Sequence, residues 1–346
     1  MGFHLADGTL YTYLRGDEYE DIAAAWDWNL IPGTTVDYGA TPLNCAHAGW
    51  NGLESFVGGV SNGETGAAAM RYLNPYTKAF SWQKAWFFVD DDTQYVMIAN
   101  LTSRSTAPVY SVLDQRLHSG PVYVGDKAFD TPGNETFNRT VSSLWHGGVG
   151  YSFDAGPTVL SLSVGDRTGA WSAIGTSTQP PETVDIFAAW IEHQDLTQPV
   201  SYAIFPGTTF DSFRVKSTYR TIIPLQNDAY ISAILDMDYN TISAVFWDAS
   251  GGTLFIDNGP FSYGPASITV SGAVALLLNL DTGTFTVSDP SQTLTGVDVL
   301  VEGIRETPLA CTVNLPPGPG GLAGSSVTTQ CFPVIPSRHR VQHRDI

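Results

Sequence analysis

Acidic and aromatic side chains are interleaved in one stretch near the start of the chain, within residues 10–35. Aromatic faces stack on the apolar faces of sugar rings, while carboxylates accept hydrogen bonds from hydroxyl groups or hold a catalytic cation in place. This stretch therefore predicts a carbohydrate-binding surface close to the first residue. Its acidic members are Asp17, Glu18, Glu20, Asp21 and Asp27, and its aromatic members are Tyr11, Tyr13, Tyr19, Trp26 and Trp28.

The acidic run at residues 16–21 has two other interpretations. A solvated turn between two strands would explain it in isolation, but the Trp26-Asp27-Trp28 sequence that follows favours a functional surface. A calcium site would need a regular spacing of oxygen ligands, and the run matches no defined calcium loop. We therefore predict no metal and no cofactor. The pair His339 and His343 has a metal-like spacing but no third ligand.

Four histidines lie in further polar and aromatic clusters: His47, His118, His146 and His193. Taken singly, each is better explained by a structural role. If one of them met Glu54 or Glu192 in a concave cleft, the pair could act as the acid and base of a sugar epimerase, and sequence spacing leaves this alternative open. The sequence contains no His-Glu-x-x-His motif and no phosphate-binding loop.

The elements that must position these residues are predicted to be strands. Only 14% of the 346 residues are charged, and 34 Gly and 21 Pro favour strands and turns over helices. No long segment with a helical period intervenes between the strand signals, so the sheets are expected to be antiparallel. Residues 66–72 form the one short stretch with a helix-like composition. The first set of predicted strands comprises residues 9–14, 85–89, 94–99, 158–164 and 200–205.

A second set of strands begins beyond residue 221 and predicts a separate unit. We expect a large domain at 1–220, a smaller β-sandwich at 221–307, and a Pro/Gly-rich linker with a basic, disordered tail at 308–346. Cys311 and Cys331 could close a loop around that linker, whereas Cys45 is predicted to be a buried free thiol. The second set comprises residues 229–235, 241–247, 253–256, 267–270, 273–278 and 284–287.

The net charge of −18 argues against a nucleic-acid partner, because this surface would repel a phosphate backbone. An acidic surface also keeps a secreted protein soluble. Sequons at Asn100, Asn134 and Asn138 fit an extracellular glycoprotein, although the first residues have no signal-peptide pattern. No apolar run is long enough to span a membrane. We therefore expect a soluble piece of a secreted protein.

Several of these clusters resemble the β-domains of polysaccharide lyase family 8, the hyaluronate, chondroitin AC and xanthan lyases. The resemblance covers residues 3–290 and implies a large antiparallel β-supersandwich followed by a smaller β-sandwich. The matching elements, in the order of that family, are Arg15-Gly-Asp-Glu-Tyr-Glu-Asp-Ile, Trp26-Asp-Trp-Asn-Leu-Ile-Pro-Gly-Thr-Thr, Leu117-His-Ser-Gly-Pro, Trp145-His-Gly-Gly-Val-Gly-Tyr, and His193 followed by Tyr202-Ala-Ile-Phe-Pro-Gly.

The resemblance also implies a reaction, β-elimination at a uronic acid, in which a base removes the C5 proton and the glycosidic oxygen leaves from C4. That family carries its Asn, His, Tyr and Arg catalytic groups on an α/α-toroid domain that precedes the β-domains, so a missing helical domain is the expected partner. Glu18 is implied as the catalytic residue contributed from the β side, where it would pair with the catalytic Arg. Tyr19, Asp21, Trp26 and Trp28 are the predicted substrate-binding residues.

Two departures from that pattern bear on the substrate. Asp21 stands where the chondroitin lyases have an Asn that contacts substrate, which puts binding of the same sulphated or uronic-acid glycan in doubt. Residues Ala23, Ala24 and Ala25 replace an expected Pro before the Trp-Asp-Trp sequence. The alternative function is a non-catalytic carbohydrate-binding or structural β-sandwich module.

Overall fold

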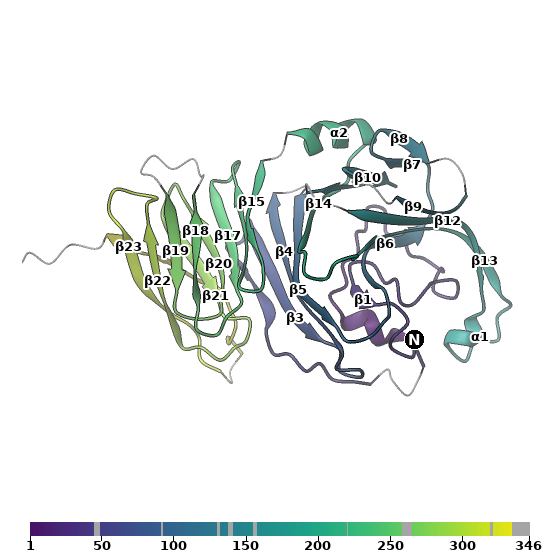
Figure 1. Cartoon of the computed structure of the whole chain (residues 1–346), viewed down its shortest axis with the longest axis horizontal. Helices are drawn as coiled ribbons and strands as arrows, with labels where there is room; N and C mark the ends of the chain where they lie inside the picture. Colours follow the sequence, from purple (N-terminus) through teal and green to yellow (C-terminus); the bar gives the residue numbers. More distant parts are fainter. Residues whose placement is uncertain are drawn as a thin grey trace, which may run out of the picture.

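Four antiparallel β-sheets are stacked face to face along the long axis of the molecule (Figure 1). The computed structural model describes residues 1–44, 49–90, 93–129, 132–137, 141–154, 158–219, 221–257, 265–318 and 321–333. Cys45, His47, the Asn138 sequon and the basic tail lie outside these residues. Helices are few in the described chain: a 3₁₀ turn at Gly2–Ala6, α1 at Trp171–Ile174 and α2 at Phe210–Thr218.

The first two sheets form the larger sandwich. The first sheet has the order β1 (Thr35–Asp37), β6 (Val109–Leu117), β13 (Glu182–Glu192), β12 (Val159–Gly169) and β9 (Gly133–Phe137). The second has the order β2 (Val57–Ser61), β3 (Gly66–Leu73), β4 (Phe80–Asp90), β5 (Thr93–Ser103), β14 (Val200–Pro206), β11 (Val149–Phe153), β10 (Ser143–His146), β7 (Val122–Val124) and β8 (Lys127–Phe129).

The third and fourth sheets form the smaller sandwich. The third has the order β15 (Ile222–Asn227), β16 (Ile231–Asp236), β17 (Thr241–Phe246), β20 (Ala275–Asn279), β21 (Thr284–Ser288) and β24 (Val327–Gln330). The fourth has the order β18 (Gly252–Ile256), β19 (Ala266–Val270), β22 (Gly296–Glu302), β23 (Leu309–Asn314) and β25 (Phe332–Pro333). The predicted all-β fold, a large antiparallel supersandwich followed by a smaller sandwich, is confirmed.

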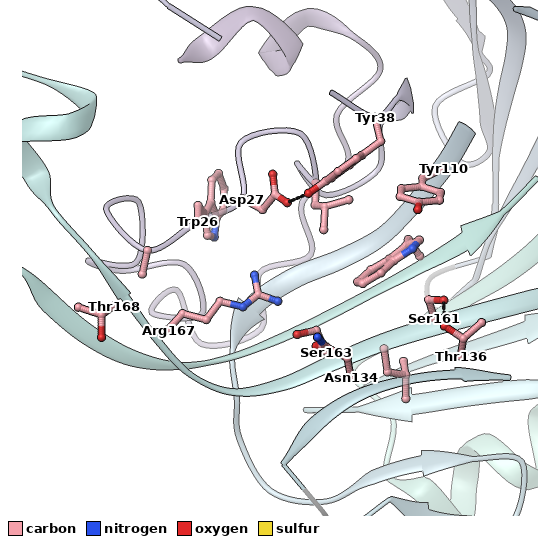
Figure 2. Close-up of a pocket in the computed structure, with 14 residues that line it drawn as sticks. Trp26, Asp27, Tyr38, Tyr110, Asn134, Thr136, Ser161, Ser163, Arg167 and Thr168 are labelled. Atoms are coloured by element: carbon pink, nitrogen blue, oxygen red, sulfur yellow. Dashed lines mark hydrogen bonds between the residues drawn. The ribbon is translucent and has the colours of Figure 1, made fainter. Parts of the chain in front are cut away.

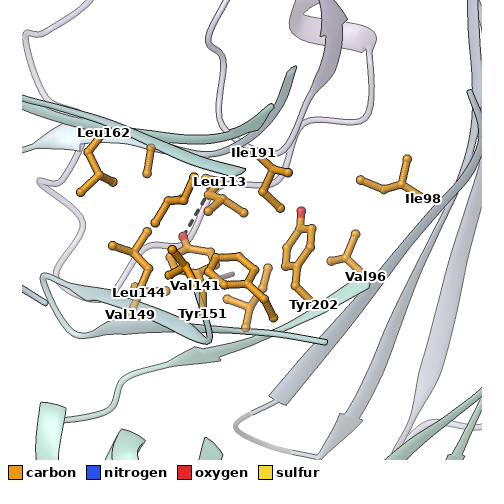
Figure 3. Close-up of a cluster of buried hydrophobic side chains, with 14 of the residues drawn as sticks. Val96, Ile98, Leu113, Val141, Leu144, Val149, Tyr151, Leu162, Ile191 and Tyr202 are labelled. Carbon is orange, nitrogen blue, oxygen red and sulfur yellow. Dashed lines mark hydrogen bonds between the residues drawn. The ribbon is translucent and has the colours of Figure 1, made fainter. Parts of the chain in front are cut away.

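Three hydrophobic cores hold the four layers together, one at each junction between sheets. In β5, Val96 and Ile98 face the core shared with the first sheet (Figure 3), whereas Tyr95 and Met97 face the core shared with the third sheet. Successive side chains of a strand point to opposite faces. The continuous apolar run in this strand is therefore explained by burial on both sides.

The middle core joins the two sandwiches. Ala69 of β3 and Phe87 of β4 pack there with Val245 and Leu277 of the third sheet. The predicted domain boundary near residue 220 falls between α2 and β15. The chain segments before and after this boundary share the apolar interface of the middle core.

Three local predictions were wrong. Residues 9–14 form no strand, because the backbone of Thr12 pairs with side chains: its N–H lies 3.4 Å from the Tyr19 hydroxyl and its carbonyl accepts from Arg116. Residues 66–72 form strand β3 instead of a helix. The small side chains Ala67 and Ala69 allow the third sheet to pack closely there, and tertiary packing overrides helix propensity.

The third correction concerns the predicted linker from residue 308. Strand β23 pairs with β22, and β24 pairs with β21, so the smaller sandwich includes segments on both sides of the Pro/Gly-rich stretch. Cys311 and Cys331 form a disulfide across that stretch. The chain on the N-terminal side of this stretch is ordered in the sandwich, and the apolar side chains of Leu309, Val313 and Leu315 add to the core.

Candidate functional site

Four chain segments far apart in sequence meet around a cavity of about 510 Å³. Each segment belongs to one of the elements that carried the sequence resemblance. They contribute the acidic loop at 14–18, the end of β6 at 116–119, the turn after β10 at 145–148, and the link from β14 to α2 at 207–210. The fold therefore gathers parts of four of the five motifs at this cavity, and Glu18 lies in its wall.

The Glu18 carboxylate is held by the backbone of its own loop. Oε1 accepts hydrogen bonds from the N–H groups of Leu14 (2.8 Å) and Arg15 (2.7 Å), and Oε2 accepts from the N–H of Gly16 (3.0 Å). A carboxylate offers about four acceptor positions. The loop backbone therefore satisfies most of this capacity and holds the carboxylate in the wall of the cavity.

Hydrogen bonding sets the protonation state of Glu18. Burial opposes the charge, but the backbone N–H groups of Arg15, Glu18, Leu14 and Gly16 outweigh it and lower the pKa from 4.5 to about 2. A group with so low a pKa is a poor proton acceptor near neutral pH. Glu18 is thus suited to hold a cation and unsuited to abstract a proton.

A stability measurement tests this state of Glu18. Because its folded pKa is lowered, the ionised group stabilises the fold above pH 4.5, and this contribution is lost as the pH falls towards 2. We expect Glu18→Gln to lower the free energy of unfolding by about 1–2 kcal/mol at pH 6, after allowance for solvent screening, and the gap to close by pH 2. Urea titrations at several pH values measure it. Glu20→Gln, at an exposed position in the same loop, is the control, and an equal effect of both variants would contradict the prediction.

Behind Glu18 lies a buried ion pair that the sequence analysis did not single out. Arg116 is 2% exposed and its Nε donates to the Asp114 carboxylate, while its Nη2 donates to Thr12 O (3.0 Å) and to the Tyr19 hydroxyl (2.9 Å). The Tyr19 hydroxyl in turn donates to Asp114 Oδ1 (3.0 Å). Burial disfavours the Arg116 charge, but Asp114 outweighs it and keeps the pKa of Arg116 above its ordinary value. This network fixes the loop that carries Glu18.

The histidines lie beside this cavity without lining it. His146 is buried between Phe187 and His118, and its Nε2 accepts the Ser119 N–H (3.1 Å). Burial lowers the pKa of His146 well below its ordinary value, so the ring is neutral. His118 pairs with Asp185 (2.9 Å).

The remaining histidine and glutamate candidates lie elsewhere. His193 contacts the Ser111 hydroxyl (2.7 Å), and Glu192 accepts from Ser161 Oγ (2.6 Å). Neither Glu54 nor Glu192, nor any histidine, lines the cavity at Glu18 or the cavity beside Trp26, and His47 lies outside the described residues.

The predicted substrate-binding residues are not gathered at Glu18. Tyr19, Trp26 and Trp28 belong to a chain of ring contacts with Tyr11 and Tyr13, in which neighbouring centroids are 5.0–6.4 Å apart. The Trp28 indole N–H donates to Ala23 O (3.0 Å), so this ring has a structural partner.

Asp21 and Trp26 occupy different surroundings. Asp21 is exposed, with φ of 54°, and lines neither the cavity at Glu18 nor a second cavity, of about 680 Å³, that Trp26 lines. The role of these residues in binding substrate stays a prediction.

The sequence offered a signal for Arg116 that was missed. Asp114 and Arg116 are two residues apart in a strand otherwise rich in apolar residues, and residues with that spacing lie on the same face. A charged pair at that spacing indicates a buried ion pair. Another pattern in the sequence has no functional counterpart in the structure. Gly59-Val-Ser61-Asn-Gly63 has the spacing of a nucleophile elbow, which is a turn from a strand to a helix. Here Ser61 ends β2 in a hairpin with β3 and donates to Thr65 O (3.1 Å).

In the described residues, no three His, Cys, Asp or Glu side chains are placed to hold a metal ion, and no helix has the length and apolar character needed to cross a membrane.

Comparison with known proteins agrees with this architecture. Residues 1–217 match the family model for the polysaccharide lyase family 8 super-sandwich domain, and residues 225–298 match that for its C-terminal beta-sandwich domain. The chain is 30% identical over 255 residues to chondroitinase-AC of Pedobacter heparinus, covering 72% of this chain and 36% of that protein. It is 21% identical over 182 residues to hyaluronate lyase of Staphylococcus aureus, covering 51% and 22%.

Solved structures show the same fold. A chondroitinase AC lyase studied as enzyme–oligosaccharide complexes superposes with a TM-score of 0.82 at 25% identity, covering 94% of this chain and 47% of that one. A Paenibacillus xanthan lyase gives 0.79 at 20% identity, covering 94% and 33%. The chain therefore spans less than half the length of these relatives.

The stacked sandwiches are those of the β-sandwich portion of a polysaccharide lyase. The chain belongs to polysaccharide lyase family 8, and the resemblance noted in the sequence to the two β-domains of that family is confirmed.

Proposed function

We propose that this chain forms the β-side of a secreted polysaccharide lyase that cleaves a uronic-acid-containing glycan by β-elimination. The observation that carries the proposal is the Glu18 carboxylate, which the backbone of its loop keeps ionised in the wall of the cavity. An anion held in this way stabilises and orients a cation brought to it.

The chemistry assigns Glu18 a positioning role. Removal of the C5 proton needs a base with a pKa near the working pH and a donor that neutralises the uronate carboxylate. Glu18 supplies neither. We therefore propose that a helical domain provides the base, and that Glu18 accepts a hydrogen bond from an arginine of that domain.

The test follows the ultraviolet absorbance of the unsaturated uronate product. Hyaluronan, chondroitin and xanthan are each incubated with the chain and with a longer protein that carries a helical domain ahead of residue 1. We expect product only from the longer protein, and we expect Glu18→Gln in it to lower kcat about 100-fold, as for loss of a preorganised electrostatic contact. Glu20→Gln should change kcat less than about twofold.

Two outcomes would contradict the proposal. Product formed by the chain without a helical domain would show that the base lies among these residues. Equal activity of Glu18→Gln and Glu20→Gln in the longer protein would remove Glu18 from the site.

Secretion and glycosylation belong to the same proposal. Asn100 in β5 and Asn134 in β9 are both exposed, as acceptors of N-linked glycans must be. A carbohydrate-binding module is the second candidate function. The aromatic residues that line the cavity beside Trp26 support it.

A further inference from the structure

The cavity of about 680 Å³ beside Trp26 is separate from the cavity at Glu18, and the two share no lining residue. It lies between the loop at residues 25–30 and the outward face of β12 and β13 (Figure 2). Strand β12 turns Leu160 and Val164 into the core and presents Ser161 and Ser163 to this cavity. Its volume is within the range of small-molecule sites, about 300–1,000 Å³.

Three aromatic rings form one wall of this groove. The centroids of Tyr38 and Tyr110 are 5.3 Å apart, and those of Tyr110 and Trp190 are 5.8 Å apart. All three side chains are half-buried, and they come from three different segments: the residue after β1, strand β6 and strand β13. A row of tilted rings at this spacing offers apolar faces to successive sugar rings.

A carboxylate and a guanidinium stand beside the rings. Asp27 Oδ2 accepts a hydrogen bond from the Tyr38 hydroxyl (2.6 Å). The Arg167 guanidinium points into the space between the loop and the strands (Figure 2). Its Nη1 donates to Gln115 Oε1 (2.9 Å), and its side chain makes no other hydrogen bond in the described part of the chain.

Both charged residues are fixed from beneath by one buried side chain. Gln115 is fully buried, and its Oε1 accepts from the Asp27 N–H (3.0 Å) as well as from Arg167. Its Nε2 donates to the carbonyls of Asp27 (3.0 Å) and Leu30 (2.9 Å). A binding group whose position is set in advance loses less entropy when a ligand arrives.

We propose that this groove is a second, non-catalytic saccharide-binding site, in which pyranose rings of a polysaccharide stack on Tyr38, Tyr110 and Trp190 while Asp27 and Arg167 hydrogen-bond to ring hydroxyls. A neighbouring acceptor and donor match two adjacent hydroxyls, each of which can donate and accept. The Asp27 carboxylate beside the Arg167 guanidinium would repel an anion. The groove therefore disfavours a ligand that is recognised by negative charge alone.

Affinity gel electrophoresis of the full chain tests the proposal, with hyaluronan, xanthan and a neutral galactomannan as the embedded polysaccharides. Because Asn134 lies at the edge of the groove, the protein is produced without N-glycans. We expect retardation by at least one polysaccharide, weakened about tenfold by Tyr110→Leu and by Arg167→Met, the size of one lost ring contact or charged hydrogen bond. The controls Tyr230→Leu and Arg104→Met remove the same groups from exposed positions and should leave retardation unchanged.

Urea midpoints identify any variant whose fold has changed, and the pair of independent variants keeps the test decisive if one of them is unstable. The proposal is overturned if no polysaccharide retards the chain, or if folded Tyr110→Leu and Arg167→Met proteins bind as the unaltered chain does. Because hydroxyl recognition is little screened by salt, a steep loss of binding with added NaCl would overturn the proposed ligand chemistry.

One further variant separates this site from the proposed lyase function. Glu18→Gln should leave retardation unchanged, because Glu18 is outside the groove. Loss of retardation in Glu18→Gln would assign the binding to the other cavity and contradict the proposal, whereas failure of the lyase assay would leave it intact.

Discussion

Replacement of Arg116 by methionine is expected to lower the free energy of unfolding by about 3–5 kcal/mol, the cost of leaving one member of a buried ion pair without its partner. Asp114 is 2% exposed, so its carboxylate would have no water to replace the guanidinium. The variant also leaves Thr12 O without its charged donor and removes the charged donor to the Tyr19 hydroxyl. Urea denaturation at neutral pH measures the loss.

The pH dependence of this variant supplies a second readout. Burial raises the pKa of Asp114, and loss of Arg116 removes the neighbouring charge that opposes that rise. A carboxyl whose folded pKa is raised stabilises the fold below its unfolded pKa, and this contribution is lost as the pH rises through the folded pKa. The deficit of Arg116→Met should therefore grow with pH.

Two controls make the Arg116 result specific. The exposed pair Arg15 and Asp17 has the same two-residue spacing, and Arg15→Met should cost less than about 1 kcal/mol because water screens the pair. The double variant Asp114→Asn, Arg116→Met should be more stable than Arg116→Met, since no unpaired charge remains. If Arg116→Met cost no more than Arg15→Met, the ion pair would not hold the Glu18 loop.

The strand pattern was predictable because burial on both faces leaves a direct trace in the sequence. The apolar runs in β5 and β20 face a different core on each side, and the predicted strands at 94–99 and 273–278 coincide with them. Residues 66–72 misled the prediction, because alanine has high helix propensity. Here the small alanine side chains allow two sheets to pack closely. This packing depends on residues distant in sequence, so the segment itself gives no sign of it.

The candidate site was predictable only in part. Glu18 was found from the motif around it, but the cavity depends on Gly148, Thr208 and Thr209, which only the fold brings to it. Trp26 and Glu18 are eight residues apart in sequence yet line different cavities, since the loop between them turns and buries Ile22. The acidic and aromatic residues clustered in the sequence predicted one binding surface, but the fold divides them between two cavities.

The motif that begins at Trp26 ends in Pro-Gly-Thr-Thr, and this end is hydrogen-bonded to Lys84. This lysine of β4 is fully buried, and its Nζ donates to Gly33 O (2.6 Å) and to Thr35 Oγ1 (3.1 Å). The Thr35 hydroxyl contacts Ser111 (2.9 Å), which contacts His193 (2.7 Å). No carboxylate forms an ion pair with Lys84 among the described residues, and burial lowers its pKa from 10.5 to about 7.

Stability should therefore rise with pH in a window set by Lys84. With a folded pKa of about 7 and an unfolded pKa of 10.5, the unfolded chain binds the extra proton between these values, and the slope of unfolding free energy with pH is positive. Relative to Lys84→Met, the unaltered chain should gain about 3 kcal/mol between pH 7 and pH 9.5, at about 1.4 kcal/mol for each unit. Urea titrations of both proteins across this range measure the gain.

The comparison between the two proteins cancels groups that titrate in both. His193 does not disturb this comparison, because burial and the nearby Lys84 lower its pKa from 6.5 to about 4, and both values lie below the window. Lys127→Met, at an exposed position, should give a curve parallel to that of the unaltered chain. Parallel curves for Lys84→Met as well would mean that Lys84 stays charged when buried, and then its two oxygen acceptors and the faces of Trp82 and Trp86, with centroids 5.8 and 5.5 Å away, would suffice to hold an ammonium ion beneath the motif.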